Sequence, residues 1–409
     1  MNPVVGLDVA KGESQVQAFL DKKKPYKRSF KVAHTIEGLE SLHQYLREIE
    51  NVTGIRPPVV LESTGHYHTP VVQYFEERGY LLIIVNPLIS YRAKSSSLRK
   101  VKTDLIDARH LCELYYKEDL EPYKKRGIQL LNLRNLSRQH ANITGIYVQT
   151  KLQFQAVLDQ VFPEYRGVFG DLYSVVSLLT LLEFPTSEDI SAVDEETVAN
   201  RINELCPSRS RKWANTQAEK LMAASARNPF QRTLYQSHIL SLEMYIKMLL
   251  EYQKHLSKFE EEINALAKEI EEYKIIQSIP GIGEKIATTI ISEIGEIDRF
   301  NHPKKLVAFA GIDPSIFESG KFKGSVKTKR GSGRLRHALY MAVRCAIRDC
   351  RKKKTTDEII PRNKRLREFY DKKREEGKPF KVAVIACANK LLQWIYALLQ
   401  NNSTFQDLT

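Results

Sequence analysis

The order of secondary-structure elements in the N-terminal third constrains the fold more than any other feature of this sequence. Apolar and alternating runs predict strands at residues 3–9, 14–20, 26–32, 58–61 and 80–85. Helices are predicted at residues 35–50, 69–78 and 104–116. Three strands followed by alternating helices and strands are typical of an antiparallel meander that continues into parallel strands with crossover helices. We therefore predict an α/β domain with a ribonuclease-H-like fold over residues 1–120.

The rest of the chain is predicted to be mainly helical. Residues 125–274 would form a helical region with a less regular insertion near 165–210, and residues 275–409 a helical C-terminal domain. Two helices, at 334–351 and 380–399, would close the chain. A heptad-like apolar seam runs through the second half of the middle region: Ile239, Leu242, Ile246, Leu249, Leu256, Ile263, Leu266 and Ile270. This spacing predicts a coiled-coil arm and motivates the prediction that the chain self-associates as a dimer or tetramer.

Positive charge is concentrated in one segment. Between Gly320 and Lys381 the sequence has 22 Lys and Arg against 7 Asp and Glu, a net charge of +15, whereas the whole chain carries +14. A concentrated basic segment is typical of a protein that binds a polyanion. A solvated charged surface is the alternative, because charge runs are common on protein surfaces.

Four carboxylates occupy positions where the predicted fold would bring them together. Asp8 ends the first strand and Glu62 the fourth, and these strands are neighbours in a ribonuclease-H-like sheet. Asp104 and Asp107 lie three residues apart on one face of the last helix. Converging carboxylates repel one another unless a cation neutralises them, and Mg²⁺ prefers such oxygen ligands. The four acids together predict a Mg²⁺ site.

Each acid also has a purely structural explanation. Aspartate is common in turns at strand ends, and Asp104 with Asp107 could form a helix cap worth about 1 kcal/mol. Only the joint pattern favours a metal site. Upstream of Asp104 lies a basic run that could hold a nucleic-acid backbone near the metal: Arg92, Lys94, Arg99, Lys100 and Lys102.

A short turn near the start of the C-terminal region is a candidate phosphate site. Residues 279–283 read IPGIG and precede an amphipathic helix from Glu284. This arrangement resembles a helix-hairpin-helix turn, in which backbone N–H groups near Gly281 and Gly283 would bind a phosphate. Pro-Gly pairs also form ordinary turns, so the motif alone is weak.

A Gly-, Ser- and Lys-rich segment follows at residues 317–336. A serine hydroxyl is a poor nucleophile unless a base or metal takes its proton. On chemistry alone Ser315, Ser319, Ser325 and Ser332 are equal candidates. Clustered cations surround Ser319 and could stabilise a phosphoryl transition state: Lys321, Lys323, Lys329, Arg330, Arg334 and Arg336.

Seven short motifs occur in an order that is typical of one family. They are GLDVAK at Gly6, ESTGHY at Glu62, KTDLIDARHL at Lys102, IPGIG at Ile279, FAGIDPSIFESGKFKG at Phe309, KRGSGRLRHAL at Lys329 and EGKPFKVAVIACANKLLQWIYALL at Glu376. On these residues the chain resembles the insertion-sequence 110 family of transposases, also called bridge-RNA-guided recombinases. The motifs cover about 1–120 and 275–400, and the middle region is not matched by motif.

The resemblance implies a RuvC-like domain whose DEDD acids are Asp8, Glu62, Asp104 and Asp107. It also implies a C-terminal transposase domain with a nucleophilic serine, for which the ESGK position gives Ser319. Family members are thought to form a covalent 5′-phosphoserine link to DNA at a composite site that includes the metal-bound acids. A structured bridge RNA would pair with donor and target DNA.

Two other functions stay open from the residues alone. The acids alone would suit a metal-dependent nuclease of junction-resolvase type, and the basic segment alone a nucleic-acid-binding scaffold with an inactive site. The complete four-acid set weighs against the scaffold, and the ESGK and KRG motifs weigh against the nuclease.

The sequence also carries expectations about location. It has no run of about 18 apolar residues, no secretory signal, and five cysteines without zinc-like spacing. We therefore expect a cytoplasmic, nucleoid-associated bacterial or archaeal protein that makes no membrane contact.

Overall fold

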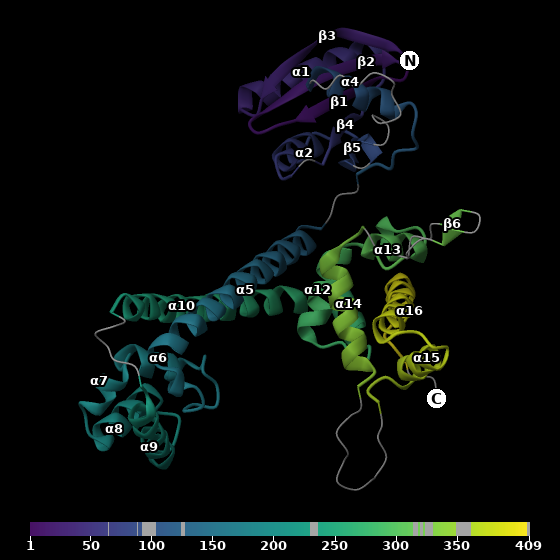
Figure 1. Ribbon diagram of the computed structural model, residues 1–409. Coiled ribbons are helices and arrows are strands. Elements are labelled where there is room, and N and C mark those ends of the chain that lie inside the picture. Colours follow the sequence, from purple (N-terminus) through teal and green to yellow (C-terminus); the bar gives the residue numbers. More distant parts are fainter. Residues whose placement is uncertain are drawn as a thin grey trace. The chain divides into compact units, whose positions relative to one another are not determined.

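The computed structural model describes residues 1–63, 65–87, 89–91, 104–123, 127–229, 236–313, 318–319, 322–323, 330–348 and 361–406. For residues 104–105, 318–319 and 322–323 only the backbone is described. The chain divides into two compact units, Met1–Lys125 and Arg126–Thr409 (Figure 1). The middle and C-terminal regions that the sequence separates therefore share one unit.

A five-stranded sheet forms the centre of the first unit. Its strands are β1 (Val4–Val9), β2 (Glu13–Asp21), β3 (Lys24–Ala33), β4 (Val59–Glu62) and β5 (Leu82–Val85). Their order is β3-β2-β1-β4-β5. The first three strands pair antiparallel, β4 is parallel to β1, and β5 is parallel to β4. This topology confirms the predicted meander that continues into parallel strands.

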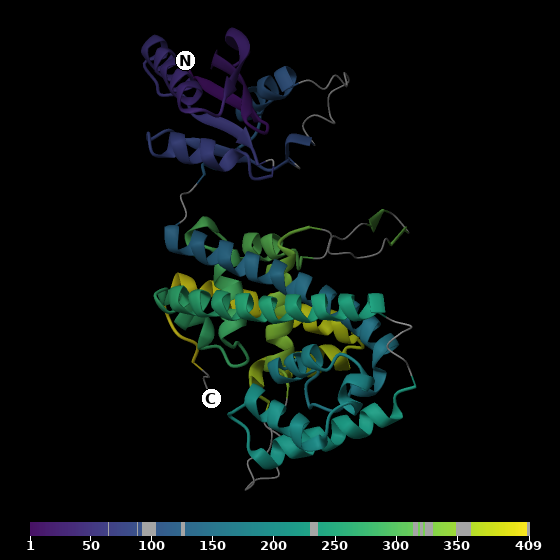
Figure 2. The same cartoon turned by 90° about the vertical axis from the view of Figure 1, so that its left-hand side faces the viewer.

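Helices cover both faces of this sheet. On one face lie α1 (Ile36–Thr53) and α2 (His68–Glu76), which contribute Leu42, Leu46 and Phe75 to the larger core. On the other face lies α4 (Asp104–Tyr115), which contributes Leu111 and Leu114 to a smaller core. The sheet is therefore the middle layer of three, as the two views of the ribbon show (Figures 1 and 2).

Two long helices run through the second unit. They are α5 (Ile128–Val161) and α10 (Gln236–Lys268). Gln253 Nε2 donates to Tyr147 Oη at 2.9 Å, and His140 lies 3.3 Å from Glu260, so the two helices are antiparallel. The apolar seam predicted in α10 packs within this chain, because Ile239, Leu242, Ile246, Leu249 and Ile263 are all buried. The coiled coil and the self-association remain predictions, because the seam residues pack against other parts of the same chain.

This helix pair joins two hydrophobic cores. At one end it packs with η1 (Pro163–Tyr165), α6 (Val175–Glu183), α7 (Ser187–Ser191), α8 (Glu195–Leu205) and α9 (Arg211–Arg227), which contain the region predicted as an insertion. At the other end Leu130, Leu133 and Ile263 belong to the core of the C-terminal helices. The helix pair α5–α10, which we call the arm, therefore contributes residues to both cores of the second unit.

The C-terminal helices surround the second of these cores. They are α11 (Glu271–Gln277), α12 (Glu284–Ile294), η3 (Ile297–Arg299), α13 (Pro303–Ala310), α14 (Gly333–Ala346), α15 (Lys364–Glu375) and α16 (Phe380–Gln400). The sequence predicted α14 and α16 but missed α15. The apolar residues of α15 are few and its charge is high, so the sequence shows little amphipathic pattern there, while the structure packs the helix against α14 and α16 and caps it with Asn363.

One helix bears on the expectation that the chain does not cross a membrane. Within the described part of the chain, α16 is long and apolar enough to cross a membrane by length and composition. However, Val384, Leu391 and Ile395 are fully or almost fully buried in the C-terminal core. Packing against α11, α13, α14 and α15 accounts for the apolar surface of this helix.

Candidate functional site

Asp8 lies on the face of the sheet that α4 covers. Alternating residues of β1 point to opposite faces, and Val5, Leu7 and Val9 belong to the core under α1 and α2. Val4 belongs to the core under α4. Asp8 is an even number of residues from Val4, so its side chain lies on the same face of the sheet, and it is partly buried near the end of the strand.

Glu62 lies on the same face at the end of the neighbouring strand. In β4, Leu61 packs under α1 and α2 and Val60 under α4, so alternation places Glu62 on the α4 side. Leu7 pairs with Leu61 in the parallel register. Asp8 and Glu62 follow these residues, and the two carboxylates therefore lie near the ends of adjacent strands.

Helix α4 brings a third acid over this face. Asp107 is buried, with 9% of the residue exposed. A Cβ at Gly6 would overlap the carbonyl oxygen of Ala108, so only glycine lets α4 approach β1 this closely. The thiol of Cys112 lies beside the same glycine. Burial raises the pKa of this thiol, so it stays neutral and Cys112 serves in packing.

The donor set suits a hard divalent cation, although the geometry of a site is incomplete. Asp104 begins α4, but its side chain lies outside the described residues. Among the side chains that are described, no group of three or more His, Cys, Asp or Glu is placed to hold a metal ion. Asp8, Glu62 and Asp107 nevertheless supply the carboxylate oxygens that Mg²⁺ prefers. The predicted basic run, Arg92, Lys94, Arg99, Lys100 and Lys102, also lies outside the described residues.

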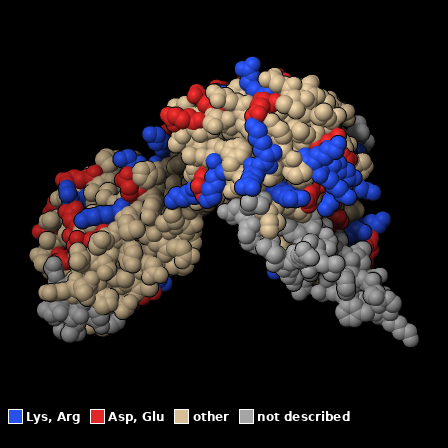
Figure 3. Space-filling view, turned by 90° about the horizontal axis from the view of Figure 1, so that it is seen from above, with Lys and Arg blue, Asp and Glu red and all other residues tan. Residues whose placement is uncertain are grey.

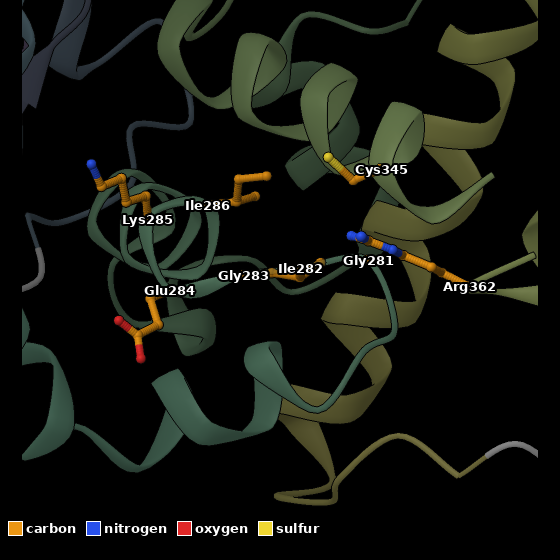
Figure 4. A pocket seen from close by; sticks show the side chains of 8 residues that line it. All are labelled: Gly281, Ile282, Gly283, Glu284, Lys285, Ile286, Cys345 and Arg362. Carbon is orange, nitrogen blue, oxygen red and sulfur yellow. The ribbon is translucent and has the colours of Figure 1, made fainter. Parts of the chain in front are cut away.

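The IPGIG turn lies beside a cavity of about 440 Å³ in the second unit. Gly283 precedes α12 without a side-chain cap, so backbone N–H groups at this helix start face the turn. Figure 4 shows that the side chain of Arg362 reaches toward the Gly281–Gly283 turn, and Cys345 also lines the pocket. Lys285 points away and lies 2.7 Å from Glu260. An exposed arginine and free helix N–H groups are a combination that can bind a phosphate.

Ser319 is the last residue of β6 (Glu318–Ser319). It pairs with Phe322 of β7 (Phe322–Lys323), so only residues 320–321 separate the strands. Its side chain and that of Lys323 are not described, and Lys321 and Lys329 lie outside the described residues. The structure therefore gives the backbone position of the predicted nucleophile.

The three arginines that follow are described. Arg330 and Arg334 are exposed, and Arg334 donates to Asn142 Oδ1 at 3.1 Å. Arg336 is partly buried, and its Nη1 donates to the carbonyl oxygens of Ala310 and Arg330 at 3.3 and 3.1 Å. In the structure Arg336 bonds to the backbone, and its contact with nucleic acid remains a prediction.

Comparisons with known proteins agree with the motifs. Residues 5–163 match the DEDD transposase model of the IS110 group, described as "Transposase", and residues 273–360 match the "Transposase IS116/IS110/IS902 family". The chain belongs to the insertion-sequence 110 family of transposases. The part of this transposase between the two matches contains α6–α9 and the whole of α10.

Named relatives support the same family. A "Transposase for insertion sequence element IS1111A" of Coxiella burnetii is 31% identical over 39% of this chain, and the match spans only 41% of that relative. An "Insertion element IS116 uncharacterized 44.8 kDa protein" of Streptomyces clavuligerus is 21% identical over 98% of this chain and 95% of its own length. A "Pilin gene-inverting protein" of Moraxella bovis is 29% identical over 32% of this chain and 38% of its own.

A solved structure gives a weaker likeness. RuvC of T. thermophilus in complex with a Holliday junction substrate is 12% identical and covers 30% of this chain and 100% of that chain, with a TM-score of 0.23. The ribonuclease-H-like assignment for the transposase rests on its own sheet topology.

Sequence reasoning missed a buried carboxylate in the transposase. Glu293 lies on α12 with 1% of its side chain exposed and is paired with Arg138 of α5 at 2.8 Å. A signal was present, because Glu293 stands between Ile290, Ile291 and Ile294 on the apolar side of an amphipathic helix. An acid in such a position requires a buried partner.

Charge on the visible surface is grouped rather than uniform. In the space-filling view, Lys and Arg side chains gather in patches with Asp and Glu between them (Figure 3). In α15, Lys364, Lys372 and Arg374 are exposed, while Arg367 is paired with Asp371 at 2.9 Å. Exposed cations of α15 therefore remain available to a polyanion.

Proposed function

We propose that this transposase cuts and rejoins DNA with Ser319 as nucleophile, assisted by Mg²⁺ bound to Asp8, Glu62, Asp104 and Asp107. The observation that carries the proposal is the position of Asp8 and Glu62, at adjacent strand ends on the face covered by α4. Asp107 lies on the same helix and is buried. The match to DEDD transposases over residues 5–163 supports the assignment of the acids.

The reaction would exchange one phosphate ester for another. The Ser319 oxygen attacks the phosphorus of a DNA phosphodiester, and a serine–phosphate bond forms as the bond to the 3′ oxygen breaks. The serine loses its proton and the departing 3′ oxygen gains one. Attack by another 3′-hydroxyl on the phosphoserine reverses these steps and rejoins DNA, so the number of phosphate ester bonds is conserved.

The four acids would act as ligands rather than as proton carriers. Bound Mg²⁺ would stabilise the negative charge that develops on the attacking and leaving oxygens. The carboxylates hold the cation on the sheet face, and their mutual repulsion is relieved when it binds. Titration calorimetry tests this without activity: Asp8→Asn and Glu62→Gln should each weaken Mg²⁺ binding at least tenfold.

DNA would be held through its phosphates at several places. The Gly281–Gly283 turn with Arg362 supports one non-specific phosphate contact. The basic run from Arg92 to Lys102, the cations around Ser319 and the exposed residues of α15 would add others. Binding through phosphates predicts an affinity that falls steeply as salt is added.

Guidance by a structured bridge RNA and assembly into a dimer or tetramer are further parts of the proposal. The family membership supports both. Because the α10 seam is buried within one chain, a second copy would have to use another surface. Light scattering of the nucleic-acid-bound protein tests assembly, and a monomeric mass would refute it.

The deciding experiment looks for a covalent adduct. The purified protein, the element's flanking RNA and end-labelled target DNA are incubated with Mg²⁺ and then denatured. We expect an adduct with the wild type and with Ser325→Ala, a control in the same segment, but none with Ser319→Ala or Asp107→Asn. Cut DNA without an adduct would instead establish the nuclease alternative and remove Ser319 from the site.

A further inference from the structure

The residues just before and just after the segment that carries Ser319 lie side by side, at the end of α13 and the start of α14. The backbone N–H of Ser332 donates to the carbonyl of Phe309 at 2.7 Å. A Cβ at Gly331 would overlap the backbone nitrogen of Gly311. Gly311 therefore lies directly against Arg330 and Gly331, and we call this meeting point the base of the segment of residues 312–330 that carries Ser319.

Arg336 connects the two sides of this base by hydrogen bonds. Its Nη1 donates to the carbonyl oxygens of Ala310, Gly311 and Arg330 at 3.3, 3.2 and 3.1 Å. The carbonyls of Ala310 and Gly311 lie at the C-terminal end of α13, and the carbonyl of Arg330 lies just before α14. One charged group thus satisfies backbone acceptors on both sides.

Ser332 joins the base to the rest of the unit. Its Oγ accepts from the backbone N–H of Leu335 at 3.2 Å, which caps the start of α14. The same hydroxyl donates to Oε2 of Glu293 at 3.0 Å. Ser332 therefore ties the returning end of the segment to α12.

Glu293 in turn ties α12 to the arm. Arg138 of α5 donates to both carboxylate oxygens, from Nε at 2.8 Å and from Nη2 at 3.0 Å, and Arg134 lies at 3.5 Å. Burial raises the pKa of the Glu293 carboxyl, but the hydrogen bonds and charge of Arg138, with Ser332, leave it below its usual value. The carboxylate is ionised at neutral pH, and a satisfied buried network of this kind fixes one geometry.

We propose that Glu293 and Ser332 are positioning residues that fix the base of the 312–330 segment, and through it Ser319, relative to the arm helix α5. The inference rests on the proposed role of Ser319 as nucleophile. It also separates Ser332 from Ser319 as a candidate nucleophile, because the Ser332 hydroxyl is already bonded to Glu293 and to the N–H that it caps in α14. A displacement of the arm would be transmitted to the serine through Arg138, Glu293 and Ser332.

The test compares two serine variants of the full-length protein. Both lose a helix cap, but only one also loses a hydrogen bond to Glu293. Ser332→Ala removes a cap and the bond to Glu293. Ser210→Ala removes an equivalent cap from α9, where Ser210 Oγ accepts from the N–H of Trp213 at the same 3.2 Å, but has no link to the segment. We expect Ser332→Ala and Glu293→Gln to slow adduct formation about tenfold or more, because small displacements of a reacting group are costly. DNA affinity should stay within about twofold, Ser210→Ala should match the wild type, and Ser332→Thr, which keeps the hydroxyl, should restore the rate.

Amide hydrogen exchange gives a second readout that does not need activity. Peptides spanning residues 309–333 should exchange faster in Ser332→Ala and Glu293→Gln than in the wild type or Ser210→Ala. If the wild type forms no adduct, the proposed nucleophile fails while the exchange experiment still decides on the base. Wild-type adduct rates in both variants would overturn the inference, and so would unchanged exchange in both.

Discussion

The acids of the first unit and the serine of the second are held in opposite ways. Asp8 and Glu62 end strands in the middle of a five-stranded sheet, and α4 covers them with a buried face. Ser319 lies on a two-residue strand that pairs with another two-residue strand. The acids are fixed by the elements they belong to, whereas the serine is fixed through the base of its segment.

This difference determines what each site tolerates. A substitution elsewhere that displaces the acids must move the sheet or α4, and it therefore affects the folding of the first unit. A substitution at the base of the serine segment acts within the second unit. The two tryptophans, Trp213 and Trp394, both belong to the second unit, so their fluorescence reports unfolding of that unit alone.

The largest effect is expected for Gly311→Ala at the base of the serine segment. Gly311 has φ +70°, and a Cβ there would overlap the carbonyl oxygen of Arg330. Strain and overlap together should lower the free energy of unfolding of the second unit by about 3 kcal/mol or more. Urea unfolding followed by tryptophan fluorescence measures this. Gly167→Ala is the control, since Gly167 has φ +90° with nothing within 4 Å of the added Cβ. Equal losses in the two variants would show that the base is not tightly packed.

A somewhat smaller effect is expected for Gly6→Ala beneath the acids. The added Cβ would overlap the Ala108 carbonyl and push α4 away from β1. The free energy of unfolding of the first unit should fall by about 2–3 kcal/mol. Hydrogen exchange of peptides from α4 and β1 should accelerate, while the tryptophan transition of the second unit stays in place. A shift of that transition would mean that the two units do not unfold separately.

The first unit could largely be predicted from the sequence because its site follows regular structure. Alternation along the strands and the order of elements determine which side chains end on which face. Asp8 and Glu62 follow from this local pattern together with the strand order of the fold. The identity of Gly6 as the contact point for α4 could not be predicted, because it depends on how closely two distant segments approach.

The base of the serine segment could not be predicted from the sequence for the same reason. Glu293, Arg138 and Ser332 lie on three segments as far as 194 residues apart. The apolar neighbours of Glu293 indicate that it needs a buried partner, but the sequence does not indicate that the partners are Arg138 and Ser332. The hydrogen bonds of Arg336 to backbone carbonyls could not be predicted either, because the basic run it follows says nothing of how close those carbonyls lie. Tertiary packing decides such roles.

A pH dependence should separate the two sites further. Folding lowers the pKa of Glu293, so its pairing with Arg138 stabilises the folded state above the ordinary glutamate pKa of about 4.3, and this contribution is lost as the pH falls through the lowered value. Glu293→Gln should therefore cost about 2 kcal/mol of unfolding free energy at pH 7 and less under acid conditions. Tryptophan-monitored urea unfolding at several pH values measures the difference. A cost that is the same at all pH values would show that charge on Glu293 does not contribute.

The smallest effect, and one of opposite sign, is expected for Gly145→Ala in the middle of α5. Gly145 is exposed, and nothing lies within 4 Å of the Cβ that alanine would add. Alanine is favoured over glycine in a helix, so the free energy of unfolding of the second unit should rise by about 0.5–1 kcal/mol. Because the arm keeps its contacts at both ends, the rate of adduct formation should not change. A loss of stability would mean that this face of the arm is covered in the folded protein, and that the glycine there, like Gly6 and Gly311, is required for a close approach.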